Sequence, residues 1–548
     1  MQDIKNFLFN SINKIFSDSG INEIPEIRIS TLPEFDLQLN NLLRISDKNI
    51  KNKIVKLLND LNKNPWIDKL VITEKGFVNI KYSNAYLEDY IVCIQENINS
   101  QIYTKNPKSY LLDYGGVNIG KSMHVGHIRS LNIGRGVKNL LKKAGHNVIS
   151  DIHLGDWGMP VSLILNYCIH KNIRISDLTI ESLEDIYPKS SELAKVNDEF
   201  LEGAKEINKN LNRENANFYK DWETLYEVST SEIKKTLLMF NHKFDIFEGE
   251  SDANKYIEPL LSRLKSEKKI ELDNGAYVTK LEDRNVLITK SDGSYLYITT
   301  DLGTVVRREE EYNIDSYIYI VDQRQKKHFE DLFECVNEFN LSNSEFIHIG
   351  YGTVNNKDGK PLKTREGDNY KLTTLYGDVE DKFKSNEIDS EDLKSLTNSV
   401  ITYSDLQTNR ITDYKFDIEK FTSTEGNTAV YLQYTYARSK KIIRDNDIGK
   451  NFTNYTIPSS SNEIDLDLLR ELIKLPEKFK LAEKTLELNH IADYAYELCK
   501  VFNKFYSNNK IRSSEAGLKN FRLQTTKSFV LTLEFLFSIL GIEGVKKL

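Results

Sequence analysis

The chain has 548 residues, a formal net charge of −7 at pH 7, 39% hydrophobic residues and 28% charged residues. These values are typical of a soluble globular protein, and the length is enough for about three to four domains. They argue against a membrane protein, because the longest apolar run, Phe529–Leu540, contains Thr532, Glu534 and Ser538 and is shorter than the roughly 18 residues of a membrane span.

The number and spacing of the cysteines indicate the cellular compartment and argue against certain kinds of site. The four cysteines are scattered along the chain with no CxxC pair: Cys93, Cys168, Cys335 and Cys499. This pattern favours a cytoplasmic protein without a disulfide framework or zinc ribbon, and we expect no metal site built by protein side chains. The first residues, MQDIKNFLFNSINKIF, are read as an amphipathic helix rather than a signal peptide, because Asp3 comes so early.

Residues 1–105 are predicted to form a small α+β domain. Apolar periodicity predicts a helix around Ile50–Leu61. Alternating segments predict strands at Leu70–Thr73 and Phe77–Tyr82, on either side of the turn Glu74–Gly76.

The next stretch has the order strand, glycine-rich loop, helix and strand. A short apolar strand, Tyr110–Tyr114, ends at Gly115-Gly116. Helical spacing then runs from Val125 to Ala144, and Asn147–Ile152 resumes as a strand. A βαβ unit of this kind presents backbone N–H groups and the positive end of a helix to an anion, so its expected ligand is a phosphate or pyrophosphate.

Two interpretations of the glycine-rich loop compete. Gly115–Ser122 (GGVNIGKS) fits the phosphate-loop pattern GxxxxGK[ST] of NTPases, and Tyr317–Asp322 would then supply a magnesium-binding aspartate. Such an NTPase has no use for His124-Val125-Gly126-His127 at the first turn of the same helix. This HxGH resembles the HIGH motif of class I aminoacyl-tRNA synthetases and related nucleotidylyl transferases, whose two imidazoles stabilise charge on the α-phosphate as pyrophosphate leaves.

Residues 106–384 are predicted to form a Rossmann-like domain with a doubly wound parallel sheet. A long, charged and mainly helical section at about residues 161–283 reads as an insertion. Asp301 is also a candidate N-cap of the helix that follows it. Beyond the insertion, strand-like segments are predicted at Asn285–Lys290, Tyr295–Asp301, Ser316–Val321 and Glu345–Val354.

Residues 385–548 are predicted to form an all-α helical bundle, because glycines and strand signals become rare. Pro476 suits the first turn of a helix. Another predicted helix, Tyr431–Arg444, mixes tyrosines with Arg438 and lysines, a combination that holds unstacked bases and phosphates. The alternative assignment for about half of these tyrosines is the core of the bundle.

Eight motifs together resemble the arginyl-tRNA synthetases of the bacterial type, in that family's order and over essentially the full chain. They are VNIGKSMHVGH (117–127), HLGDWG (153–158), YLYITTDLG (295–303), VDQRQKKHF (321–329), GKPLKTREGD (359–368), NRITDYKFD (409–417), EGNTAVYLQYTYAR (425–438) and YELCKVFNKFY (496–506). The resemblance implies ATP-dependent activation of L-arginine to arginyl-adenylate, followed by transfer to the 3′ end of the arginine tRNA. The phosphate-loop NTPase stays as the alternative function.

The resemblance also implies partners and domain roles. Magnesium accompanies ATP, and tRNA is usually needed even for the first step. Residues 385–548 become the anticodon-binding domain, and residues 1–105 become a domain that contacts the tRNA. We expect a monomeric, cytoplasmic enzyme that does not associate with a membrane.

Site residues follow from the same resemblance. A guanidinium is planar and permanently charged and has five donors, so its site must offer carboxylates and neutral acceptors. The implied arginine-binding residues are Asp113, Asn118, Tyr297, Asp301 and Gln325. The implied ATP-binding residues are Lys121, His124, Gly126, His127, Thr364 and Arg365, and the implied tRNA-binding residues are Tyr431, Gln433, Tyr434 and Arg438.

The chain departs from the KMSKS pattern of class I synthetases, since Pro361-Leu362-Lys363-Thr364-Arg365 stands in its place. Many arginyl enzymes share this departure, and a lysine just before HxGH is thought to take over the phosphate contact. Lys121 occupies that position. The resemblance therefore implies that Lys121, Lys360 or Lys363 acts with His124 and His127 in catalysis, and it leaves open which lysine dominates.

Overall fold

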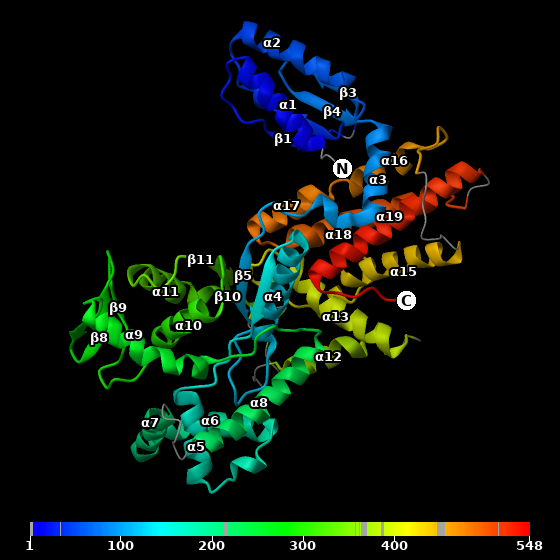
Figure 1. Ribbon diagram of the computed structural model, residues 1–548. Helices are drawn as coiled ribbons and strands as arrows, with labels where there is room; N and C mark the ends of the chain where they lie inside the picture. Colours follow the sequence, from blue (N-terminus) through cyan, green and yellow to red (C-terminus); the bar gives the residue numbers. More distant parts are fainter. Residues whose placement is uncertain are drawn as a thin grey trace.

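The computed structural model describes residues 4–32, 34–211, 218–356, 358–360, 362, 370–384, 388–446, 455–512 and 515–548. Figure 1 shows an N-terminal lobe at the top, a region built around a parallel sheet, a helical group containing α5–α8 at the bottom, and a C-terminal helical bundle on the right. The predicted multidomain α/β architecture is confirmed.

The N-terminal lobe is a four-stranded antiparallel sheet with two helices, as the α+β prediction required. Helix α1 buries a residue every fourth position, Ile4, Leu8, Ile12 and Phe16, in the apolar core that it shares with the strands. The elements are α1 (Ile4–Asp18), β1 (Ile27–Ile29), β2 (Leu37–Leu39), α2 (Lys48–Asn59), β3 (Ile67–Ile72) and β4 (Val78–Tyr82), with strand order β1-β2-β4-β3.

The central sheet is parallel and has the strand order β11-β10-β5-β6. Its strands are β5 (Ser109–Tyr114), β6 (Asn147–Asp151), β10 (Ser316–Asp322) and β11 (Glu345–Tyr351). The chain passes from β5 to β6 on one side and later adds β10 on the other side, so the strand order reverses between β5 and β10. The carboxyl ends of strands at such a switch point form the usual ligand crevice of a doubly wound sheet.

Helix α4 (Val125–Ala144) connects β5 to β6 and ends, as predicted, at Gly145 with φ 94°. It also ties the sheet to the C-terminal bundle through the buried side chain of Arg129. Arg129 Nε donates to Asp405 Oδ1 at 2.9 Å, and its Nη1 donates to the carbonyls of Gly352 and Thr412. The first turn of α4 is therefore held by packing on both of its sides.

The insertion is mainly helical, but its predicted end at residue 283 cuts through a small antiparallel sheet. The helices are α5 (Met159–His170), α6 (Ile180–Val196), α7 (Asp198–Leu211), α8 (Tyr219–Met239) and α9 (Asn254–Ser266). The sheet has the order β7-β8-β9, with β7 (Glu271–Asp273), β8 (Ala276–Lys280) and β9 (Asn285–Leu287). The predicted strand Asn285–Lys290 is thus shorter and lies outside the parallel sheet. Asn274-Gly275, both with positive φ, turn β7 into β8, and this Asn-Gly hairpin signal was missed.

The strand predicted at Tyr295–Asp301 is wrong, because helix α10 (Tyr297–Glu311) begins there. Leu296 is the N-cap, and its N–H donates to Thr299 Oγ1 at 3.0 Å. Ile298 and Leu302 lie on the buried face of the helix. The alternative N-cap role for Asp301 is also wrong, since Asp301 lies inside the helix, one turn after its start.

The last predicted strand, Glu345–Val354, is split into β11 and the short β12 (Val354–Asn355), which pairs with β13 (Tyr414–Lys415). Apart from β13, the described part of residues 385–548 is helical, and Pro476 lies in the first turn of α17 as predicted. The remaining helices are α11 (Lys326–Glu338), α12 (Leu372–Asp381), α13 (Ser390–Leu406), α14 (Ile418–Phe421), α15 (Ala429–Asp445), α16 (Glu463–Leu472), α17 (Leu475–Thr485), α18 (Asn489–Asn508) and α19 (Ala516–Leu540).

Helix α19 carries the apolar run Phe529–Leu540 in the middle of the bundle, where Phe529 stacks on Phe502 with ring centroids 4.0 Å apart. Helix α3 (Asn84–Asn97) also packs on α19, and Gln95 Nε2 donates to Ser528 Oγ at 2.9 Å. The domain limits 1–105, 106–384 and 385–548 stay predictions. Within the described ranges, no helix combines the length and the apolar character needed to cross a membrane.

Candidate active site

The candidate site lies at the carboxyl ends of β5 and β10, and its residues come from β5, from the start of α4 and from α10. The N-cap of α4 is His124, and His127 follows within the first turn. Their rings lie against each other, with centroids 4.1 Å apart. Both predicted imidazoles therefore stand together at the positive end of a helix, where an anion binds favourably.

Backbone hydrogen bonds fix the orientation of the two imidazoles. The Gly126 N–H donates to His124 Nδ1 at 3.0 Å, and the His124 N–H donates to His127 Nδ1 at 3.1 Å. Because His124 Nδ1 accepts, a neutral His124 ring carries its proton on Nε2, whereas His127 Nδ1 also lies 3.2 Å from the His124 carbonyl oxygen and can donate to it instead. A Cβ atom at position 126 would lie 2.7 Å from His124 Cε1, so this arrangement requires glycine there.

Both imidazoles are neutral near pH 7. The pKa of His127 is lowered to about 3, chiefly by burial; the neighbouring His124 and Lys121 also lower it, and a hydrogen bond to the His124 backbone opposes them. Burial and the charge of Lys121 also lower the pKa of His124. A neutral His124 ring can then donate its Nε2–H to a phosphate oxygen without carrying a buried charge of its own.

The glycine-rich loop does not form a phosphate cradle. The Gly115 N–H donates to Ser130 Oγ and the Gly120 N–H to Ser229 Oγ, at 2.8 and 3.0 Å, so neither amide is free to bind a phosphate. At the other end of the proposed NTPase site, Arg324 binds both carboxylate oxygens of Asp322, at 2.9 and 2.7 Å. The phosphate-loop interpretation of Gly115–Ser122 is therefore wrong.

Two of the three predicted lysines, Lys121 and Lys360, are among the described residues. Lys121 lies in the loop just before α4, and its Nζ is 3.7 Å from the centroid of the Tyr187 ring. Lys360 is exposed and begins the segment that stands in place of KMSKS. The end of that segment pairs with the start of α4, because the Val125 N–H donates to the Tyr370 carbonyl at 2.8 Å. Lys363, Thr364 and Arg365 lie outside the described residues.

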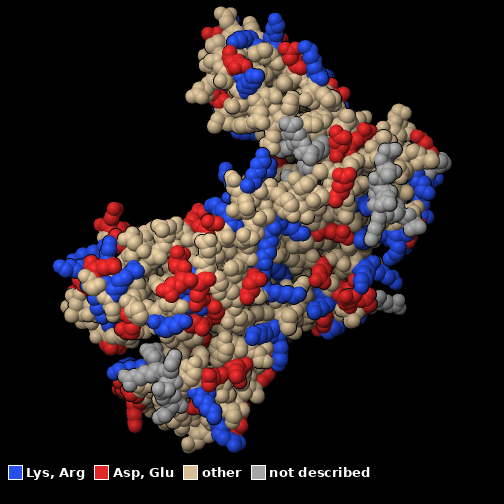
Figure 2. Space-filling view, viewed as in Figure 1, with Lys and Arg blue, Asp and Glu red and all other residues tan. Residues whose placement is uncertain are grey.

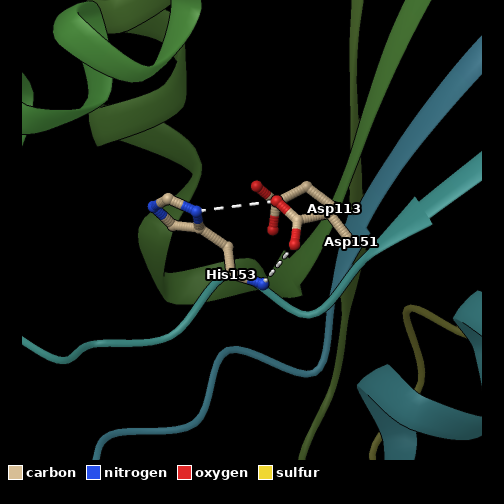
Figure 3. A group of neighbouring side chains, drawn as sticks. All are labelled: Asp113, Asp151 and His153. Atoms are coloured by element: carbon tan, nitrogen blue, oxygen red, sulfur yellow. Dashed lines mark hydrogen bonds and ion pairs between the residues drawn. The ribbon is translucent and has the colours of Figure 1, made fainter. Parts of the chain in front are cut away.

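Asp113, at the end of β5, belongs to a buried charge network (Figure 3). Arg308 from α10 donates to Asp113 Oδ2 at 2.7 Å and to Asp151 Oδ2 at 2.6 Å. This is the cationic partner that a carboxylate in an apolar strand requires. His153 faces the same pair, with Nδ1 3.7 Å from Asp151 Oδ2.

The same three side chains, Asp113, Asp151 and His153, place one ligand atom each within 4.8 Å of one another, as a metal site would. However, Arg308 already supplies the positive charge between the two carboxylates. His153 adds a second positive charge: burial lowers its pKa, but Asp151 and Asp113 more than compensate and raise it to about 9. The donor set is therefore a poor fit for a resident metal ion.

Asp301, one turn into α10, is bound to a histidine. His328 Nε2 and Asp301 Oδ2 are 2.6 Å apart. Burial lowers the pKa of His328, but the bond and charge of Asp301 outweigh burial and raise it. Asp113 and Asp301 both act on Tyr319, whose pKa is raised chiefly by burial and also by these two carboxylates. Both carboxylates therefore lie near the Tyr319 side chain.

The other three predicted arginine contacts are exposed. Tyr297, the first residue of α10, is 69% exposed, and Gln325 is exposed at the start of α11. Asn118 packs its side chain over Gly155 of the HLGDWG segment, where a Cβ atom would lie 1.9 Å from Asn118 Oδ1. The glycine therefore leaves room for this asparagine.

Glu250 was not predicted, yet it belongs to the same acidic group. It follows Gly249, whose segment pairs with Leu154 beside β6. Burial raises the pKa of Glu250 to about 8; His153 opposes this, and Asp301 and Asp156 add to it. Glu250 also raises the pKa of Tyr297. The sequence signal was the acidic segment FEGESD after a strand-like run, hidden inside a section read as helical insertion.

The predicted tRNA contacts lie on α15, and they separate into exposed and buried residues. Tyr434 and Arg438 are exposed, and the Arg438 guanidinium lies 5.2 Å from the centroid of the Tyr506 ring. Tyr431 is half-buried and accepts a hydrogen bond from Asn503. Gln433, in contrast, is 0% exposed, with Nε2 donating to Ser399 Oγ and the Glu543 carbonyl. It is part of the bundle core and cannot contact a tRNA from there.

Basic residues do not form a single stripe on the face seen in Figure 2, where lysines and arginines alternate with acidic side chains. The view also shows an open recess between the N-terminal lobe and the rest of the molecule. A cleft of about 380 Å³ beside α15 is lined by Arg438, Lys441, Tyr506 and Arg512, among others. This combination of rings and cations suits an unstacked nucleotide.

Family comparisons agree with this geometry. Residues 91–418 match the model for "tRNA synthetases class I (R), catalytic domain", and residues 432–548 match the "DALR anticodon binding domain". The doubly wound sheet and its HxGH helix start are thus those of a class I aminoacyl-tRNA synthetase. The chain is 32% identical to the arginine–tRNA ligase of Alkaliphilus oremlandii, over 98% of both proteins. It belongs to the arginyl-tRNA synthetase family.

Solved structures show the same fold. The arginyl-tRNA synthetase of Plasmodium falciparum matches with a TM-score of 0.81 and 25% identity, covering 100% of this chain and 98% of that one. The Thermus thermophilus arginyl-tRNA synthetase matches with a TM-score of 0.76 over 100% of both chains. At 17% identity, this second comparison supports the fold alone.

Proposed function

We propose that the arginine–tRNA ligase activity of this chain uses the crevice between α4 and α10, with arginine at the acidic end and the ATP phosphates at the histidine pair. ATP and L-arginine give arginyl-adenylate and pyrophosphate, and the arginyl group then moves to the 3′ end of the arginine tRNA. The observations that carry this proposal are the neutral imidazoles at the start of α4, the helix that follows β5, and the carboxylates Asp113 on β5 and Asp301 on α10, with Glu250 near Asp301.

At the phosphate end, His124 and His127 donate from Nε2 to oxygens whose charge changes as pyrophosphate leaves. Lys121 supplies a positive charge beside them, and Gly126 allows close approach of the nucleotide. Lys360 is a further candidate for this role. We keep Lys363, Thr364 and Arg365 as proposed contacts of ATP. Magnesium enters with the ATP phosphates, its usual partners, rather than with the network around Asp113.

At the arginine end, Asp301 and Glu250 provide negative charge for the guanidinium, while Asp113 is shared with Arg308. Tyr297, Asn118 and Gln325 supply neutral hydrogen-bonding groups around the same space. A desolvated guanidinium needs both kinds of partner, because each unpaired donor costs about 1–3 kcal/mol.

For tRNA, we propose that the exposed face of α15 contacts the anticodon arm through Tyr434 and Arg438, with Tyr431 beside them. Gln433 is removed from the proposed set because it is buried. We further propose that the enzyme is a cytoplasmic monomer and that residues 1–105 contact the tRNA.

The test is aminoacylation of the arginine tRNA by the purified protein with each of the 20 amino acids in turn. Charging with arginine alone is the expected result. Equal charging with a second amino acid, or with a tRNA of different specificity, would show that the acidic group has been assigned to the wrong substrate.

A further inference from the structure

Helix α6 of the insertion contacts both segments that flank the histidine pair. Its Tyr187 ring lies under Lys121, with 3.7 Å between Nζ and the ring centroid. One turn earlier on the same helix, Glu184 binds Lys371 at 2.5 Å. Lys371 in turn pairs with His124 as an antiparallel β-bridge. The insertion therefore reaches across the proposed phosphate site and holds it at two points.

The contact with Tyr187 restrains a side chain that is otherwise free to move. A lysine has four rotatable side-chain bonds and loses rotamer entropy when it is held in one place. An aromatic face attracts the ammonium and offsets part of that loss. The held ammonium is also close enough to His124 and His127 to lower the pKa of both rings.

Tyr187 also lies near the arginine end of the crevice. It contributes to the raised pKa of Tyr297, after burial and Glu250. Tyr187 thus contacts the lysine proposed to bind phosphate and also influences a tyrosine proposed to contact arginine.

We propose that Tyr187 is a positioning residue for adenylate formation, holding the Lys121 ammonium beside the histidine pair while Glu184 anchors α6 through Lys371. Tyr187 itself touches neither the reacting phosphate nor the carboxylate of arginine. This inference rests on the phosphate role proposed for Lys121.

The test is a double-mutant cycle measured by arginine-dependent ATP–pyrophosphate exchange in the presence of the arginine tRNA. Tyr187→Leu removes the aromatic face, and we expect kcat to fall about 5- to 30-fold, the size of one cation–π contact. The KM for arginine should stay within about twofold. Tyr187→Phe keeps the face and should retain wild-type kcat. In a Lys121→Ala background, Tyr187→Leu should have no further effect on kcat.

Tyr256→Leu is the matched control, because Tyr256 on α9 also has a lysine over its ring, with Lys255 Nζ at 4.9 Å, and its hydroxyl binds Glu311 at the far end of α10. It should leave exchange unchanged. If Tyr187→Leu does not give folded protein, Tyr187→Met fills a similar volume without the aromatic face and takes its place in the cycle.

The outcomes distinguish the proposed role of Tyr187 from the proposed phosphate contact of Lys121 and from the arginine–tRNA ligase activity. Equal losses from Tyr187→Leu with and without Lys121, or no loss at all, would overturn the positioning role. A Lys121→Ala variant with wild-type exchange would instead remove the proposed phosphate contact of Lys121, and the role of Tyr187 with it. The arginine–tRNA ligase activity would stand in both cases.

Discussion

The proposed arginine site contains three carboxyl groups whose charges are balanced in three different ways. Asp113 shares Arg308 with Asp151, and Asp301 is bound to His328. The third, Glu250, has a pKa raised to about 8, chiefly by burial, so it is largely protonated at pH 7. A protonated Glu250 adds no further negative charge near Asp301, and a guanidinium bound beside it would favour its ionised form.

The charged contacts to arginine should contribute more to its binding free energy than the neutral contacts do. We expect Asp301→Asn to raise the KM for arginine much more than Gln325→Ala does. Removing a carboxylate leaves a desolvated cation short of its counter-charge, at a cost of about 2–5 kcal/mol, whereas losing a neutral acceptor leaves one donor unpaired. Steady-state tRNA charging measures both effects, and the KM for ATP serves as the control.

The same site should reject citrulline, which has the shape of arginine without the charge, and lysine, which has the charge without the planar fork. A buried polar mismatch gives discrimination of about 10⁴ without editing. If citrulline is charged nearly as well as arginine, or if Asp301→Asn is silent, the guanidinium binds elsewhere.

Glu250 predicts a pH dependence of arginine recognition. A carboxyl whose pKa is raised to about 8 is protonated below that pH and gains its negative charge as the pH rises through it. We therefore expect kcat/KM for arginine to increase between pH 6.5 and 8.5, because the charged form attracts the guanidinium. His328, whose pKa is also raised, acts in the same direction when it loses its proton and frees Asp301.

Glu250→Gln should lower kcat/KM at pH 8.5 and flatten this profile, leaving only the part due to His328. The effect of Glu250 on the free energy of unfolding has the opposite sign to that of a salt-bridged carboxylate, whose pKa is lowered by folding. A carboxyl with a raised pKa is destabilising once it must ionise, so Glu250→Gln should not lower the melting temperature above pH 8. A profile unchanged by Glu250→Gln would exclude this carboxyl from arginine binding.

At the scale of single elements, the start of α4 depends on one glycine. Gly126→Ala adds a Cβ atom 2.7 Å from His124 Cε1 and 2.9 Å from its Nδ1. Helix propensity alone favours alanine by about 1 kcal/mol, so stability should change little. The His124 ring must move away, however, and we expect ATP–pyrophosphate exchange to fall at least about tenfold, the scale of one lost donor to the transition state.

Gly517→Ala is the control for that substitution, because Gly517 also lies in the first turn of a helix and an added Cβ meets nothing within 4 Å. Exchange should be unaffected there. Normal exchange by Gly126→Ala would mean that the capped position of His124 is not used in catalysis.

The sequence was sufficient to predict those helices and strands whose buried positions follow a regular local pattern of apolar residues. Strand β5, helix α4 and strand β6 were placed correctly because strand, glycines and helical spacing follow one another without interruption. Helix α10 was missed because Ile298, Thr299 and Thr300 are β-branched and favour a strand locally. The buried face of α10 packs against α9, and this tertiary contact could not be predicted from the local sequence.

The same limit applies to the candidate site. The pair His124 and His127 could be read from four residues, since their geometry is local. Glu250 could not, because its place depends on the pairing of Gly249 with Leu154, almost a hundred residues earlier. Gln433 looked like an exposed helix residue, but α13 and the C-terminal segment cover it through Ser399 and Val545.

At the scale of the whole molecule, the proposed tRNA surface and the crevice lie on different parts of the chain. Arg438→Ala should raise the KM for tRNA about 5- to 30-fold, because it removes a cation from an exposed aromatic cleft, with no change in the KM for arginine. Lys440→Ala is the matched control on the same helix, since Lys440 is paired with Glu534 at 2.9 Å. Equal effects of both substitutions on charging would point to general electrostatics instead of a specific contact.

Arginine activation coupled to tRNA is the central claim, and ATP–pyrophosphate exchange measures it most directly. With purified protein, ATP and magnesium, we expect exchange to require L-arginine and to depend strongly on the arginine tRNA. Exchange without arginine, or release of inorganic phosphate from ATP in the absence of both arginine and tRNA, would contradict the account.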